Sequence, residues 1–219
     1  MRTSVRALLL PMFLLLGGCS SSLFESLPAG TVSTCDPALP GPWTVISADS
    51  AAPNSLPRSL EIAADCRTVF DEGQPKPVKA NFVHSRAGNY VEALNDSGDL
   101  DCIGENRSHC GHFLLRYELV GSQLRLYMPD HARIAKALEH GQIQGYQPPP
   151  PDDPPQGQEP VYRNFVAGDP EQIARVLAQH PEFFVAEPTT VLERGHAAAN
   201  PSAAPKPAPP TTQPEARGQ

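Results

Sequence analysis

The fold of this chain is decided by the stretch from Phe113 to Met128, which reads FLLRYELVGSQLRLYM. Large apolar side chains recur at every second position before Val120-Gly121-Ser122 and again after it. A period of two is typical of a β-strand that buries one face, and a short glycine-containing turn joins two such strands into a hairpin. The stretch therefore predicts an antiparallel hairpin with one buried face.

Short apolar or β-branched runs on both sides of the hairpin predict further strands. They cover residues 41–46, 59–63, 66–70, 78–84, 89–94, 143–146, 161–166, 183–185 and 190–192. Two helices interrupt this pattern: Asp130 begins the first, which ends near His140, and Asp169-Pro170 begins the second, with Gln172 completing a capping box. The predicted fold class is α+β, with a curved antiparallel sheet or partial barrel and two short packed helices.

The beginning of the chain has the features of an export signal. Arg2 and Arg6 form a basic start, an apolar run follows over residues 8–16, and Gly17-Gly18 precede Cys19. Together with Leu16, this resembles the lipobox of bacterial lipoproteins. The resemblance implies that cleavage before Cys19 leaves this cysteine as the first residue, carrying thioether-linked diacylglycerol and an acylated N-terminus.

The residue after the lipobox cysteine indicates which of the two bacterial membranes carries the anchor. Ser20 stands where inner-membrane retention favours aspartate, so the expected location is the outer membrane, facing the periplasm. Several acyl chains give a stable anchor, whereas one chain alone is marginal. The membrane is therefore the expected partner of the N-terminus.

Four further cysteines remain once Cys19 is assigned to lipid, and an exported compartment favours disulfides. Four cysteines allow three pairings. Cys102 and Cys110 bracket a short polar loop, which favours Cys102–Cys110 and leaves Cys35–Cys66.

Composition divides the chain into four parts. Residues 1–18 are the signal peptide, and residues 19–40, rich in Ser, Pro, Gly and Thr, are predicted to be a lipid-anchored tether. Residues 41–196 form a single folded domain with a proline-rich excursion at 147–158, and residues 197–219 a disordered tail.

The formal net charge is −7, which argues against a nucleic-acid partner. Two clusters have metal-ligand chemistry: Cys102, His109, Cys110 and His112 for zinc, and Asp96, Asp99, Asp101 and Glu105 for calcium. Neither spacing matches a standard motif, so a disulfide and a solvated turn are favoured and no metal is expected. No cofactor fingerprint or nucleophile motif is found, and no catalytic residue is assigned.

Gly41-Pro42-Trp43 is similar to the Gly-x-Trp opening of lipocalins. That resemblance implies an eight-stranded barrel that holds a ligand; otherwise a tryptophan simply fills a small β core.

Three functions follow. The first is a non-enzymatic envelope protein, structural or an interaction module with an envelope protein partner; Pro148 to Pro155 could dock on such a partner or be only a spacer. The alternative is a lipocalin-like module for a small apolar ligand or lipid, lined by inward residues such as Trp43, Leu60, Leu115, Tyr117 and Leu126. An envelope hydrolase would need a histidine and an acid converging in one cleft.

Overall fold

The computed structural model describes residues 20–32, 34–48, 58–72, 76–94, 100–148 and 161–195. The strands are β1 (Ser21–Phe24), β2 (Gly41–Ala48), β3 (Arg58–Ile62), β4 (Thr68–Asp71), β5 (Val78–Ser85), β6 (Gly88–Ala93), β7 (Asp101–Ile103), β8 (His109–Val120), β9 (Gln123–Tyr127), β10 (Gly145–Tyr146), β11 (Arg163–Val166) and β12 (Thr190–Arg194). The helices are α1 (His131–Glu139) and α2 (Pro170–Gln179), with short 3₁₀ turns η1 (Glu105–Arg107) and η2 (Pro181–Phe183).

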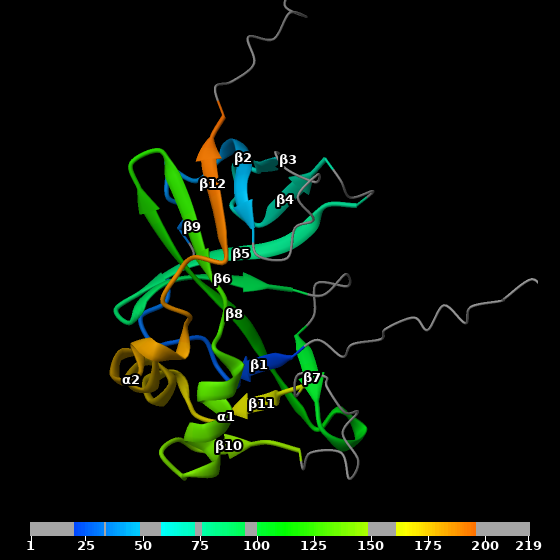
Figure 1. Cartoon of the computed structure of the whole chain (residues 1–219), viewed down its shortest axis with the longest axis vertical. Coiled ribbons are helices and arrows are strands. Elements are labelled where there is room, and N and C mark those ends of the chain that lie inside the picture. Colours follow the sequence, from blue (N-terminus) through cyan, green and yellow to red (C-terminus); the bar gives the residue numbers. More distant parts are fainter. Residues whose placement is uncertain are drawn as a thin grey trace, which may run out of the picture.

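Eight strands close into an antiparallel barrel (Figure 1). Hydrogen-bonded neighbours follow the order β8-β6-β5-β4-β3-β2-β12-β9, and β9 pairs again with β8. The sequence predicted either a curved sheet or a partial barrel. The structure has a closed barrel, because β12 pairs with both β2 and β9. With only two α-helices in the described ranges, the fold is mostly β, so the emphasis of an α+β class is misplaced.

A small layered unit lies beside the barrel and shares β8 with it. The first half of β8 pairs with β1 on one edge and with β7 on the other, and β1 continues into β11 and β10. Both α-helices pack on one face of this extension, as Figure 1 shows below the barrel. Their apolar stripes, with Ile134 and Ile173 fully buried, cover Phe24 and Leu114.

The barrel interior is lined by one apolar cluster. All five residues predicted to point inward belong to it, namely Trp43, Leu60, Leu115, Tyr117 and Leu126. An eight-stranded barrel is just wide enough for side chains to fill it, or to hold one small ligand. The alternation read from the sequence therefore assigned the inner face correctly.

The predicted hairpin is β8–β9, with Gly121-Ser122 at the turn. The expectation of a single buried face is wrong for the half of the hairpin that lies away from the turn. Leu114 is 0% exposed and Tyr127 4%, and both pack on the helical side rather than inside the barrel. The hairpin therefore joins the two cores, because its strands are covered on both faces.

The expected tether over residues 19–40 is corrected by the structure. Ser21–Phe24 form β1, which lies inside the sheet between β8 and β11, and Leu23 and Phe24 are 1% and 0% exposed. Farther along, Val32 bridges His84 of β5 and Leu39 is buried in the barrel. Folded structure therefore begins far ahead of residue 41.

Both predicted helix starts are confirmed. The carboxylate of Asp130 accepts a hydrogen bond from the Arg133 amide, and Asp169 and Gln172 form the full capping box with Pro170 in the first turn. A strand at residues 183–185 is wrong, since Phe183 ends η2 and only Phe184 forms an isolated bridge. Cys19, most of the proline-rich excursion and the tail lie outside the described residues.

Candidate ligand-binding site

One end of the barrel is closed by an aromatic ring and its partners. Trp43 is 1% exposed, and its indole N–H donates to the carbonyl of Leu39 at 2.8 Å. The guanidinium of Arg194 lies over the indole ring and also donates to the carbonyl of Pro40 at 3.2 Å. The segment before β2 is thereby fastened across this end of the barrel.

The two disulfides are Cys35–Cys66 and Cys102–Cys110, as the favoured pairing predicted. Cys66 is 2% exposed inside the barrel, so Cys35–Cys66 ties the closing segment to the interior. Cys102–Cys110 joins directly opposite residues of β7 and β8. It also removes both thiolates from the zinc hypothesis, and no group of metal ligands is found among the described residues.

The histidines of the zinc hypothesis have other neighbours. His109 stacks on Tyr146 with ring centroids 4.3 Å apart, and His112 hydrogen-bonds to Glu92. Of the four calcium candidates, Asp96 and Asp99 lie outside the described residues. Asp101 begins β7 and Glu105 begins η1.

The opposite end of the barrel is more exposed, and six strands agree on this. Along each strand, the inward residue nearer the closed end is buried, whereas the inward residue farther from it is partly or well exposed. The pairs, buried residue first, are Val45 and Ala48, Ile62 and Leu60, Phe82 and Val78, Val91 and Ala93, Tyr117 and Leu115, and Leu124 and Leu126. The inward residues are therefore buried at one end of the barrel and more exposed at the other, which we call the open end.

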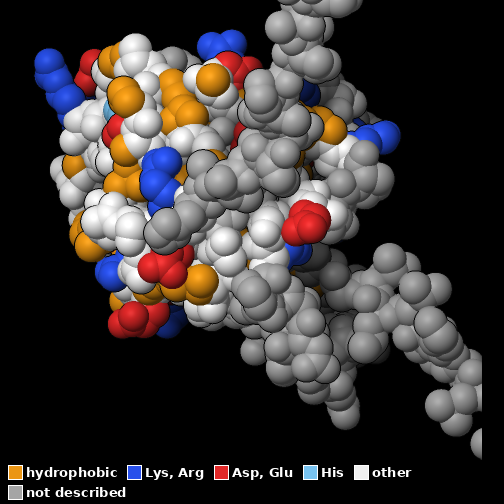
Figure 2. Space-filling model, turned by 90° about the horizontal axis from the view of Figure 1, so that it is seen from above, with side chains coloured by type: hydrophobic (Ala, Val, Ile, Leu, Met, Phe, Trp, Pro, Cys, Tyr) orange, Lys and Arg blue, Asp and Glu red, His pale blue; other side chains and the backbone are white. Residues whose placement is uncertain are grey.

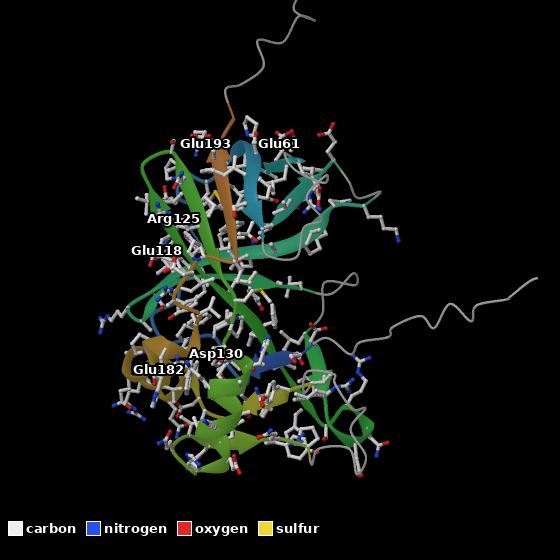
Figure 3. All side chains as sticks on the ribbon, in the orientation of Figure 1. Glu61, Glu118, Arg125, Asp130, Glu182 and Glu193 are labelled. Atoms are coloured by element: carbon white, nitrogen blue, oxygen red, sulfur yellow. A yellow bond between two sulfur atoms is a disulfide. The ribbon has the colours of Figure 1, made fainter. Side chains whose placement is uncertain are left out.

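The rim of the open end carries an ion pair. Arg58 and Asp71 share the inward face of β3 and β4 with Leu60, and their side chains meet at 3.2 Å. On the β8–β9 hairpin, the charged residues alternate with the inward ones and so face outward. Figure 3 shows Glu118 and Arg125 on the outer side of the β8–β9 hairpin.

The hydroxyl group of Tyr117, inside the barrel, also has hydrogen-bonding neighbours. The Tyr117 hydroxyl lies 3.3 Å from Nδ1 of His84, and the same nitrogen lies 3.0 Å from Oδ1 of Asn89. Burial raises the pKa of Tyr117, and the charge of Asp36 raises it further, so the hydroxyl stays protonated. The Tyr117 hydroxyl is thus engaged by His84 within the barrel.

A histidine and an acid do converge, as a hydrolase would need, but they lie in the barrel wall. Nδ1 of His112 is 2.5 Å from Oε1 of Glu92, and the side chains are only 18% and 7% exposed. Asn81 donates a second hydrogen bond to the same carboxylate. Burial favours a raised pKa for Glu92, but the hydrogen bonds from His112 and Asn81 bring its pKa below the ordinary value.

A serine and a histidine also meet. The Ser22 hydroxyl is 2.9 Å from Nδ1 of His131, and Asn164 donates to both Ser22 and the His131 carbonyl. Ser22 and Asn164 are both 0% exposed, which leaves no path for a substrate to the hydroxyl. We interpret this group as the contact that fixes α1 on β1 and β11.

A comparison with known protein families, curated proteins and solved structures finds no match to this chain. Among the described residues, no helix has both the length and the apolar character needed to cross a membrane.

Sequence reasoning identified the inward residues of this site but missed its open end and its rim. Alternation assigns a side chain to a face and says nothing of its height along the barrel axis. The run from Arg58 to Ile62 contained the signal for the rim, because Arg58 keeps the same alternation as Leu60 and Ile62.

Proposed function

We propose that this chain is a lipid-anchored protein of the bacterial envelope whose barrel binds one small ligand with an apolar body at its open end. The observation that carries the proposal is the strand-by-strand change from buried to exposed inward residues. The sequence ranked a structural or interaction module first. The closed barrel is compatible with the binding alternative, because a barrel of this size can hold one small ligand, and the exposed inward residues at one end support it.

The chemistry of the open end suggests the ligand class. Leu60, Leu115 and Leu126 offer apolar surface, and the Arg58–Asp71 ion pair provides charge at the rim. Burying a methylene contributes about 0.8 kcal/mol, so a chain of about ten methylenes is needed to reach the roughly 8 kcal/mol of micromolar affinity. A small amphiphile, with its apolar part inside and its polar end at the rim, fits this distribution.

Anchoring through Cys19 is part of the proposal and rests on the lipobox. An even number of cysteines remains for the two disulfides once Cys19 is set aside, which supports that assignment. The anchor would place the binding end in the envelope without any membrane-spanning helix.

The test is a fluorescence titration of the chain from residue 19 onward, with Cys19→Ser to keep it soluble. Trp43 is the single tryptophan, and it lies in the barrel, so it transfers energy to dansylated undecanoic acid bound at the open end. We expect saturable transfer with one site per chain.

Matched variants locate the site. Leu115→Lys and Leu60→Gln should weaken binding at least about tenfold, which corresponds to roughly 1.4 kcal/mol. Phe70→Gln is the control, because Phe70 is 50% exposed and faces outward beside the inward Val69. Equal binding by all three folded variants, or no saturable binding by the parent chain, would refute the proposal.

A further inference from the structure

The anchor residue is joined to the fold without a spacer. Ser20, next to Cys19, accepts a hydrogen bond at its hydroxyl from the amide of Tyr162 at 3.0 Å. The Ser21 amide donates to the carbonyl of the same Tyr162 at 2.8 Å. Consecutive Cα atoms are about 3.8 Å apart, so the lipid would be attached one residue from a fixed point of the sheet. A flexible tether between the anchor and the domain would span roughly 25 Å, and the fixed position of Ser20 removes that freedom.

That fixed point lies beside the open end. Registers across three strands place Ala93 of β6, Phe113 of β8 and Leu23 of β1 in one row. Ala93 is an open-end residue, and Leu23 and Phe24 pair with Phe113 and His112, in the part of β8 that precedes Leu115. Because neighbouring strands are about 4.8 Å apart, Leu23 lies about 10 Å from Ala93, and Ser20 lies three residues farther back along the chain. In Figure 1, the chain enters β1 on the side of the molecule where β6 ends and β7 lies.

The surface around the attachment point suits a lipid headgroup region. Val161 is 46% exposed, and Arg163, opposite Ser21 in the parallel pair, is exposed as well. Val78 at the open end is 44% exposed. Apolar and basic side chains of this kind are favoured where acyl chains meet headgroups. Above the barrel, by contrast, acidic, basic and hydrophobic side chains are interspersed (Figure 2).

We propose that acylated Cys19 holds the open end of the barrel directly against the bilayer surface, so that the partner of this face is the lipid headgroup layer. This inference rests on the proposed anchor and open end. A ligand dissolved in the bilayer then reaches the rim without crossing water. A freely tethered barrel would turn in all directions and gain no such route.

The experiment uses the acylated full-length mature protein in phosphatidylcholine–phosphatidylglycerol vesicles that contain a headgroup-attached nitroxide lipid. Three exposed valines are changed one at a time, Val78→Cys, Val120→Cys and Val161→Cys, and labelled with nitrobenzoxadiazole. The four cysteines of the described residues are in disulfides and do not react. Val161 reports the attachment point, Val78 the open end, and Val120, beside the Gly121 turn, the closed end.

We expect quenching at Val161 and Val78 to exceed that at Val120 at least threefold. Insertion of about ten Gly and Ser residues between Cys19 and Ser20 should remove the difference between Val78 and Val120. Quenching at Val161 with equal signals at Val78 and Val120 would overturn the orientation. Absence of quenching at all three would overturn the anchor, and with it the inference. Failure of the soluble chain to bind dansylated undecanoic acid would instead refute the ligand proposal alone.

Discussion

The guanidinium carbon of Arg194 lies 4.6 Å from the centre of the Trp43 ring, so the last strand of the barrel covers the residue that fills its closed end. Arg194 and Trp43 are also opposite each other in the β12–β2 register. This contact closes the interior on one side and leaves only the other side for a ligand.

Arg194→Ala should therefore destabilise the fold. A partly desolvated cation–π contact contributes about 1 kcal/mol, and the hydrogen bond to Pro40 about as much again. We expect a loss of about 2 kcal/mol in the free energy of unfolding, measured by urea titration of Trp43 fluorescence. Arg86→Ala, in the exposed β5–β6 turn, is the control and should stay within about 0.5 kcal/mol. Similar losses in both variants would contradict this role.

Removal of β1 distinguishes a strand from a tether. A soluble chain that begins at Glu25 lacks Leu23 and Phe24, whose burial stabilises the fold by about 1.5–3 kcal/mol each. We expect it to lose about 3–6 kcal/mol and the amide protection of β11, which hydrogen exchange measures. A soluble chain that begins at Ser20 should keep both. If the two chains were equally stable, residues 20–24 would be a tether after all.

The two disulfides should differ in their contributions. Cys35–Cys66 closes a separation of 31 residues and Cys102–Cys110 one of 8. Loop entropy then gives about 3.7 kcal/mol for the first and about 2.5 kcal/mol for the second. Paired Cys→Ser variants in urea titrations should preserve this order, and the first should also loosen the closed end, seen as red-shifted Trp43 emission. A larger loss for the shorter loop would contradict the ranking.

The pair of Glu92 and His112 should make stability depend on pH. The folded state holds the pKa of Glu92 below the pKa of the unfolded chain. At a pH between these two pKa values, the unfolded state binds more protons than the folded state, so stability falls as the pH is lowered. The stabilisation is present above the unfolded pKa and is lost as the pH falls through the folded pKa.

Glu92→Gln should lower stability at pH 7 by about 2 kcal/mol, because hydrogen bonds to a charged group are lost. It should also flatten the decline in stability below pH ~4.5, followed by urea titrations at several pH values. Glu171→Gln, on the exposed first turn of α2, serves as the control. An acid limb that keeps its slope in Glu92→Gln would assign the pH dependence to other carboxylates.

Local patterns predicted much of the fold. The hairpin at Phe113 to Met128, both helix caps and the five inward residues follow from alternation, capping and spacing, which act over a few residues. Closure of the barrel and the position of β1 depend on distant partners, as when Ser21 pairs with Arg163. A strand of four residues that is buried on both faces shows no alternation, so β1 gave no signal.

The candidate site was predicted only in part for the same reason. The identity of the inward residues is local, but the exposure of Leu115 against the burial of Tyr117 depends on strand tilt around the whole ring. The buried pair of Glu92 and His112 likewise joins strands that the sequence could not place side by side.

The most direct test of the ligand proposal is a leucine methyl spectrum of the soluble chain, recorded during titration with dodecanoic acid. Binding at the open end should give saturable shifts for Leu60, Leu115 and Leu126, with smaller shifts for Leu124 and Leu192 in the buried half of the barrel. Shifts confined to methyls outside the barrel, or no saturable shift at all, would contradict binding at the open end.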